Sequence, residues 1–178
     1  PCLQHLIISF RTDVKDGNEK LMKILHNTYN LQILSISPFF QDSGSLDSTS
    51  LKNISNNSHL SKFMFGISQI NSFPDEFWEL SNLKSIFMFL SPLDGYSGTH
   101  ISEKIGNLKK LKEFNIPCIN LVDLPKSLYT LTDLESLSLI QYPDSTNRII
   151  ISDSIGKHKK LKELNFSSDF MDNLPESM

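Results

Sequence analysis

Apolar residues recur along the chain in a six-residue pattern, Leu-x-x-apolar-x-apolar, that occurs seven times. The fourth and sixth positions of the pattern are two residues apart, so in a strand their side chains point to the same face. Successive copies start 28, 29, 23, 28, 23 and 27 residues apart. The pattern predicts seven short strands that share one core, and they begin near Leu3, Leu31, Leu60, Leu83, Leu111, Leu134 and Leu161.

A longer period of about 50 residues is superimposed on these strands. The segment 101–115 recurs at 151–165 with ten of its fifteen positions identical. An apolar residue followed by proline occurs at Phe73-Pro74, Leu124-Pro125 and Leu174-Pro175, where proline fixes φ as the chain turns back. Periods of this length indicate a solenoid, in which stacked neighbours bury the apolar face that one repeat cannot bury alone.

The segments between the strands predict two kinds of connection. Residues 19–29 place Leu21, Met22, Ile24 and Leu25 at helical spacing, which predicts a helix on the outer side of the solenoid. The polar stretches 41–58, 92–99 and 141–147 are expected to be insertions that project from the frame.

The seven motifs, with the tail Leu124-Pro125-x-x-Leu128-x-x-Leu131, resemble the leucine-rich repeat family over the whole chain, in particular its intracellular type. The resemblance implies an α/β solenoid: a horseshoe or right-handed superhelix whose curved parallel sheet has about seven short strands, with helices or turns on its convex side. It also implies one leucine-rich repeat domain over residues 1–178.

The sequence departs from that family at the ninth position of each motif, where the family usually carries asparagine. We therefore expect irregular repeats, because none of the seven residues is Asn: they are Arg11, Phe39, Ser68, Ser91, Ile119, Tyr142 and Asp169. Neither end carries a capping motif. The expectation is a piece of a longer protein that can self-associate through its uncapped ends.

Composition and charge narrow the classes of function. With 17 basic and 20 acidic residues the net charge is −3, which does not favour nucleic acid, and no apolar run is long enough to span a membrane. Cys2 and Cys118 make no disulfide framework, and the five histidines lack metal-ligand spacing. The sequence therefore predicts no cofactor, no metal and no catalysis, with His59 and His158 solvated and the lysine runs at 109–112 and 157–162 forming solvated turns.

The family resemblance implies that a protein partner binds the concave sheet face and its adjoining loops. Outward strand positions should be polar, yet several here are large and apolar and are followed by a mixed-charge region. This combination is typical of a protein interface. The predicted partner-binding residues are Ile33, Met64, Phe87, Phe89, Lys112, Glu113, Asn115, Glu135 and Ile140. One alternative is that loops after Phe39 or Leu90 fold over this face, and another is that the strand register differs in this irregular stretch.

These observations predict a non-catalytic interaction scaffold or ligand-recognition module in the cytoplasm. Such a module fits a receptor fragment, for example the sensing segment of an innate-immune receptor, or a microbial repeat protein. The alternative is the substrate-recognition segment of a larger enzyme, a ligase or a kinase, whose catalytic domain lies outside this chain.

Overall fold

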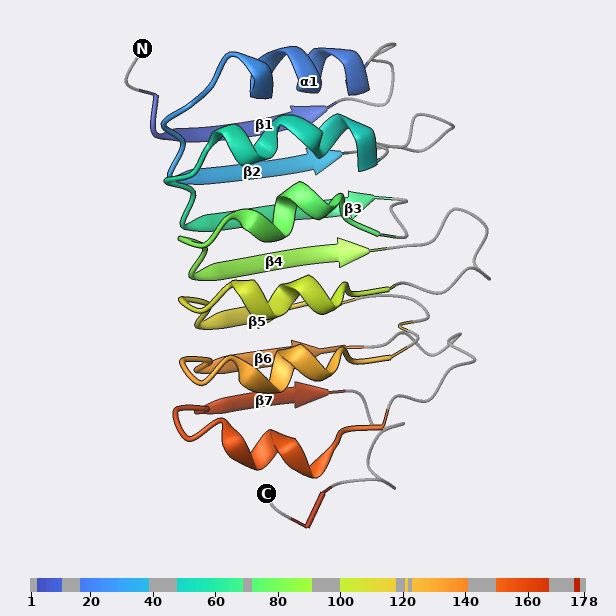
Figure 1. The fold of residues 1–178 in the computed structure, drawn as a ribbon. Helices are drawn as coiled ribbons and strands as arrows, with labels where there is room; N and C mark the ends of the chain where they lie inside the picture. Colours follow the sequence, from blue (N-terminus) through green and yellow to red (C-terminus); the bar gives the residue numbers. More distant parts are fainter. Residues whose placement is uncertain are drawn as a thin grey trace.

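Seven parallel strands form one sheet in chain order, which confirms the predicted solenoid (Figure 1). The computed structural model describes residues 3–10, 17–38, 48–68, 72–90, 100–117, 121, 123–140, 150–166 and 175–176. The strands are β1 (His5–Phe10), β2 (Ile33–Pro38), β3 (Lys62–Ser68), β4 (Ser85–Leu90), β5 (Glu113–Asn115), β6 (Ser136–Leu139) and β7 (Glu163–Phe166).

One backbone feature fixes the register at each of the six strand junctions. The carbonyl oxygen of the residue at the second motif position accepts two N–H groups from the next repeat. Between β2 and β3, for example, the Gln32 oxygen accepts from the Ser61 and Lys62 nitrogens at 2.8 and 3.0 Å. Since a slip of one residue would turn the buried side chains outward, this shared acceptor keeps every motif in phase.

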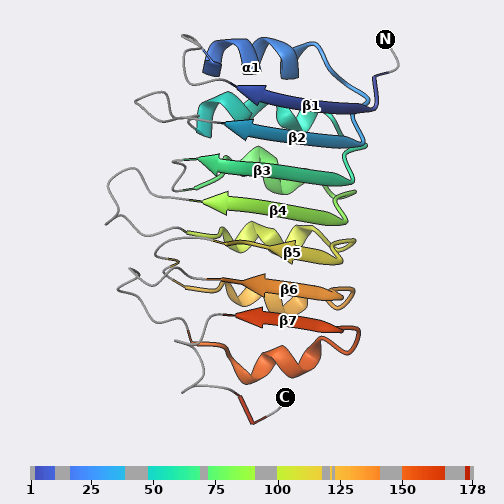
Figure 2. The same cartoon turned by 180° about the vertical axis from the view of Figure 1, so that it is seen from behind.

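Helical segments cover one face of the sheet and leave the other face open, as the views from opposite sides show (Figures 1 and 2). The outer layer consists of the helix α1 (Gly17–His26) and five 3-10 helices: η1 (Ser48–Asn56), η2 (Asp75–Glu79), η3 (Glu103–Asn107), η4 (Lys126–Thr130) and η5 (Asp153–Lys157). The core lies between this layer and the side chains at the fourth and sixth positions of each motif.

Two expectations about this outer layer need correction. The helix α1 ends at His26, before the predicted end at residue 29, because Asn27 and Thr28 donate to the Ile24 and Leu25 carbonyls three residues back. The stretch 41–58 does not simply project, since its residues 48–56 form η1, which buries Leu51 and Ile54. Residues 92–99 and 141–147 lie outside the described part, as do all the ninth-position residues except Ser68.

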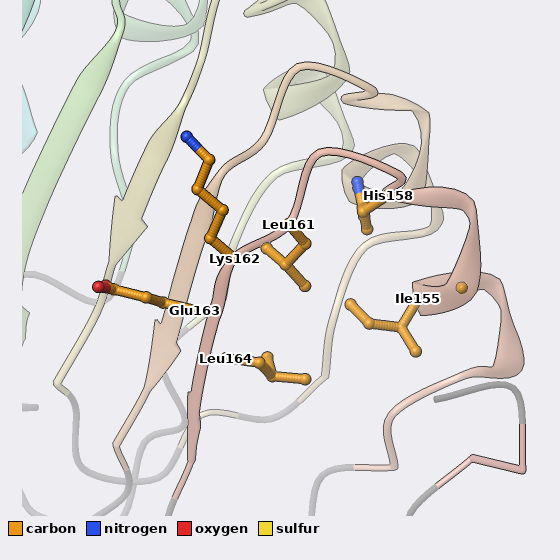
Figure 3. Close-up of a pocket in the computed structure, with 7 residues that line it drawn as sticks. Ile155, His158, Leu161, Lys162, Glu163 and Leu164 are labelled. Atoms are coloured by element: carbon orange, nitrogen blue, oxygen red, sulfur yellow. The ribbon is translucent and has the colours of Figure 1, made fainter.

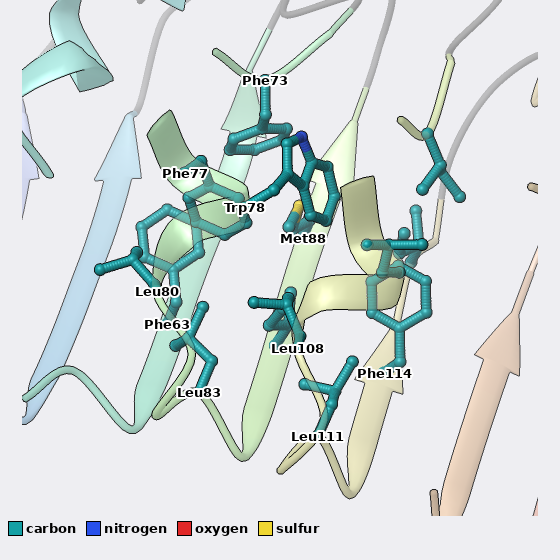
Figure 4. Close-up of a cluster of buried hydrophobic side chains, with 14 of the residues drawn as sticks. Phe63, Phe73, Phe77, Trp78, Leu80, Leu83, Met88, Leu108, Leu111 and Phe114 are labelled. Atoms are coloured by element: carbon teal, nitrogen blue, oxygen red, sulfur yellow. The ribbon is translucent and has the colours of Figure 1, made fainter. Parts of the chain in front are cut away.

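The middle of the core is an aromatic cluster (Figure 4). The rings of Phe63, Phe65, Phe73, Phe77 and Trp78 pack with centroids 4.8 to 6.3 Å apart, mostly edge to face. Edge-to-face packing places the positive rim of one ring against the negative face of another. The cluster joins strand β3 to the returning segment at η2.

The expectation that His158 is solvated is wrong. Its side chain is only 5% exposed, and it follows η5 at the position where Leu108 follows η3 and Leu131 follows η4. The imidazole Nδ1 lies 2.9 Å from the Leu131 carbonyl oxygen, so a backbone acceptor draws this histidine inward. His59 is exposed, as predicted.

The 3-10 helices η3 and η4 approach each other closely at Gly106. A Cβ atom placed on Gly106 would lie 2.8 Å from the Ser127 Cβ, closer than real Cβ contacts allow. Next to this contact the Glu103 carboxylate accepts the Lys126 and Ser127 backbone N–H groups, each at 2.9 Å. Those two bonds satisfy donors at the start of η4, and they lower the pKa of Glu103.

Candidate protein-binding face

The open face is lined by two rows of side chains that cross all seven strands. These rows contain the third and fifth motif positions, which alternate with the buried fourth and sixth. The third-position row is His5, Ile33, Lys62, Ser85, Glu113, Ser136 and Glu163. The fifth-position row is Ile7, Ser35, Met64, Phe87, Asn115, Ser138 and Asn165.

Apolar side chains gather where this face crosses β2 to β4. Met64 on β3 and Phe87 on β4 are register partners, and both are partly buried. Phe89 lies two residues beyond Phe87 on β4, and Ile33 on β2 is the register partner of Lys62 rather than of Met64. We call the adjacent pair Met64 and Phe87 the apolar patch, since these two residues are set side by side by the register.

The same face is polar from β5 to β7, and charged side chains line its edge. Glu135 lies between two lysines, with its oxygens 2.8 Å from the Lys112 Nζ and 2.6 Å from the Lys162 Nζ. Hydrogen bonds from both ammonium groups lower the pKa of Glu135 to about 2. This charge ladder runs along the edge of the sheet where the strands begin.

Two further carboxylates, on Glu113 and Glu163, lie one residue farther into the strands. Each accepts a hydrogen bond from the serine on the preceding strand, Ser85 Oγ at 2.7 Å and Ser136 Oγ at 3.2 Å. Figure 3 shows Glu163 leaving β7 on the side opposite Leu164, toward the open face. These carboxylates are therefore held in place by neutral hydroxyl groups.

A hollow of about 290 Å³ joins the apolar patch to these carboxylates. Within it the Oδ1 atom of Asn115 is buried and has no hydrogen-bond partner among the described residues. The hollow spans β3 to β7, and its lining consists of Lys62, Met64, Ser85, Ile86, Phe87, Glu113, Asn115, Ser136 and Glu163.

The sequence predicted some of the residues that line this hollow as partner-binding residues, but not all of them. It proposed Met64, Phe87, Glu113 and Asn115, which the register brings to one hollow. Ile140 follows the end of β6, is 43% exposed, and is not part of the lining. Of the lining residues that were not predicted to bind a partner, Ile86 occupies a buried fourth motif position. The others, Lys62, Ser85, Ser136 and Glu163, all occupy the third motif position, so the repeat alignment itself contained the signal.

A second hollow lies beside β7 at the C-terminal side of the sheet (Figure 3). It also measures about 290 Å³ and includes the buried His158 together with Leu161 and Leu164, which are only partly buried. Their counterparts in the preceding repeat, Leu134 and Leu137, are almost fully buried. Self-association through the ends of the chain stays a prediction.

Within the described residues, no three His, Cys, Asp or Glu side chains are grouped so that they could hold a metal ion. Cys2 and Cys118 lie outside these residues. Among the helices that the structure describes, none is long and apolar enough to cross a membrane.

Comparison with known proteins identifies the architecture. No family model matches the sequence, and no curated protein matches it either. Among solved structures, a leucine-rich repeat protein from Leptospira interrogans superposes on 93% of this chain with a TM-score of 0.62 and 18% identity. The leucine-rich repeat domain of the type III effector XopL superposes on 97% with a TM-score of 0.53 and 16% identity.

The chain corresponds to 43% of the Leptospira chain and to 71% of the XopL domain. At these identities the likeness concerns the fold, and it agrees with the seven parallel strands in chain order and with the phase of the motifs. The chain is a leucine-rich repeat solenoid.

Proposed function

We propose that this solenoid is a protein-interaction module that binds a polypeptide partner across its open face. The observation that carries the proposal is the pair Met64 and Phe87, two large apolar side chains side by side on outward strand positions beside a hollow. Clustered apolar anchors surrounded by polar and charged groups are the usual anatomy of a protein interface.

Packing of the sheet itself does not explain this pair. The core of β3 and β4 lies on the other face, where Phe63, Phe65, Ile86 and Met88 are nearly or fully buried. Met64 and Phe87 add nothing to that core, and outward strand positions of an isolated sheet should be polar. A partner that covers them would remove apolar surface from water, which favours association.

The lining of the hollow supports binding rather than chemistry. Its polar residues are two serines, two glutamates, a lysine and an asparagine. Among the described residues, no histidine or cysteine lines it to activate the serine hydroxyls, which already donate to Glu113 and Glu163. We place the binding in a recognition or scaffold segment, such as that of an innate-immune receptor or a microbial repeat protein.

The test is a capture experiment with Phe87→Asp. Immobilised wild type should retain a protein from a lysate of the source organism, and Phe87→Asp should lose about 2 kcal/mol of binding free energy, or about thirtyfold in Kd. The matched control is Ile7→Asp, because Ile7 lies in the same row on β1 and is 74% exposed.

Circular dichroism and thermal unfolding should show that both variants remain folded. Two results would contradict the proposal. Equal retention by all three proteins would move binding away from the apolar patch, and unfolding of Phe87→Asp would show that this side chain supports the fold instead.

A further inference from the structure

We infer that the hollow on the open face selects a peptide segment in which an apolar side chain lies two or three residues from a lysine or arginine. The apolar side chain packs on Met64 and Phe87, and the basic group lies between Glu113 and Glu163. This inference rests on the proposed function, since it specifies the partner chemistry for the same face.

The order of charges along the third-position row gives the hollow a polarity. Lys62 lies on β3, Glu113 on β5 and Glu163 on β7, with serines between them on β4 and β6. Since neighbouring strands are about 4.8 Å apart, the backbones of β5 and β7, from which the two glutamates extend, are separated by roughly 10 Å. The cation therefore lies at the apolar end of the hollow, and both anions lie at the other end.

Nearby lysines do not form ion pairs with these two carboxylates. The ammonium groups of Lys112 and Lys162 both bind Glu135, at 2.8 and 2.6 Å. Each of Glu113 and Glu163 receives a serine hydroxyl instead. An ionised carboxylate offers about four acceptor sites, so both side chains keep acceptor capacity for a ligand.

Asn115 adds a third acceptor between the apolar patch and the carboxylates. It is the register partner of Phe87, and its buried Oδ1 has no partner among the described residues. A buried acceptor without a donor is costly, and a ligand that supplies one removes that cost. A guanidinium or ammonium group, which has donors and no acceptors, complements acceptor groups of this kind.

The distance between the strands determines how far apart the apolar and basic residues of the peptide should be. Phe87 lies on β4, and the space between Glu113 and Glu163 is centred on β6, about 10 Å away. A β-extended peptide advances about 3.3 Å per residue and returns a side chain to the same side every second residue. A polyproline II segment advances about 3.1 Å per residue and does so every third residue, so the apolar and basic residues should be two or three positions apart. Lys62 repels a basic residue at the opposite end and so fixes which way the segment lies.

Selection from a random-peptide phage library on immobilised wild type tests this inference. Enriched peptides should carry lysine or arginine two or three residues from an apolar residue. The fluorescein-labelled peptides, measured by fluorescence anisotropy, should bind the double variant Glu113→Gln/Glu163→Gln about tenfold or more weakly. Their affinity for wild type should also fall as salt is raised.

The charge-matched control is Glu76→Gln/Glu79→Gln, on the 3-10 helix η2 of the opposite layer, which should bind as wild type does. Replacing the basic residue of the peptide by alanine gives a second test that leaves the protein unchanged. It should weaken binding to wild type and have little effect on binding to the double variant.

The outcomes separate this inference from the proposed function. Peptides that bind through Phe87 but carry no basic residue, or that ignore the glutamine substitutions, would overturn the inference and leave the proposed function intact. Failure to select any peptide sensitive to Phe87→Asp would count against both.

Discussion

His158 is a histidine in a position that leucine fills in the two preceding repeats. Its Nδ1 lies 2.9 Å from the Leu131 carbonyl oxygen, and its Nε2 is buried without a partner among the described groups. Burial lowers the pKa of His158, because the charged imidazolium is poorly solvated there. The folded chain therefore favours the neutral ring.

A pH dependence of stability follows from that lowered pKa. Unfolded histidine titrates near pH 6.5, so below this pH the unfolded chain binds more protons than the folded chain. The stabilisation from the neutral ring is fully present above about pH 6.5 and is lost as the pH falls through the lowered folded value.

Replacing His158 by leucine should remove this dependence. Urea unfolding should measure the free energy of unfolding of both proteins at about pH 7.5 and about pH 5.5. Wild type should lose more of this free energy at the lower pH than His158→Leu does. The control His26→Gln changes an exposed histidine and should behave as wild type does. An equal difference at both pH values would show that His158 does not titrate in this range.

At position 106 the neighbouring Ser127 leaves no room for any side chain larger than that of glycine. A Cβ on Gly106 would lie 2.8 Å from the Ser127 Cβ, so Gly106→Ala should destabilise the fold by about 1–3 kcal/mol, as overpacking does. Adding Ser127→Gly removes the clashing atom, so chemical denaturation should show a favourable coupling energy in the double variant. Strictly additive effects would show that the two sites are not in contact.

At the level of elements, the charge ladder Lys112–Glu135–Lys162 links the starts of β5, β6 and β7. The folded pKa of Glu135 is about 2, below the ordinary 4.5. A lowered carboxyl pKa gives a stabilisation that is present above about pH 4.5 and is lost as the pH falls toward 2.

Glu135→Gln should therefore unfold at a lower temperature than wild type near neutral pH. This difference in unfolding temperature should shrink as the pH falls from about 4.5 toward 2. Thermal unfolding across the pH series measures the effect, and Glu79→Gln serves as the comparison for a lost exposed carboxylate. A difference independent of pH would exclude the ion pairs as its cause.

The strands could be predicted because the apolar residues of each motif show which strand positions face the core and which residues pair across neighbouring strands. The helix α1 was predicted from its 3.6-residue period, whereas η1 was missed because a Ser- and Asn-rich stretch has the composition of a loop. Leu51 and Ile54, three residues apart, suffice to pack one 3-10 face. His158 was misplaced because its acceptor, the Leu131 carbonyl, belongs to another repeat.

The candidate site also contains residues that could be predicted from the sequence and residues that could not. Met64 and Phe87 could be predicted because large apolar residues on outward positions contradict the pattern. Glu113 was proposed as part of a polar region, but its relation to Glu163 depends on cross-strand register rather than on either residue. Polar residues on an outward row are the default, so only their spacing across strands distinguishes a site.

For the whole molecule, the strand order β1 to β7 means that each strand pairs only with the repeats before and after it. Residues paired across neighbouring strands are 22 to 29 positions apart in the chain. Stability in such a solenoid is approximately a sum of repeat terms and nearest-neighbour interface terms.

The shared carbonyl acceptor at every junction makes the length of this solenoid adjustable. Excising residues 101–150 would join β4 to β7, and Ser85 would then face Glu163, a glutamate like its present partner Glu113. Two strands, or roughly 10 Å of the open face, can thus be removed or duplicated with the junction chemistry unchanged. The 50-residue unit is a module: one copy more or less should lengthen or shorten the open face by two strands while every strand joins the next in the same way.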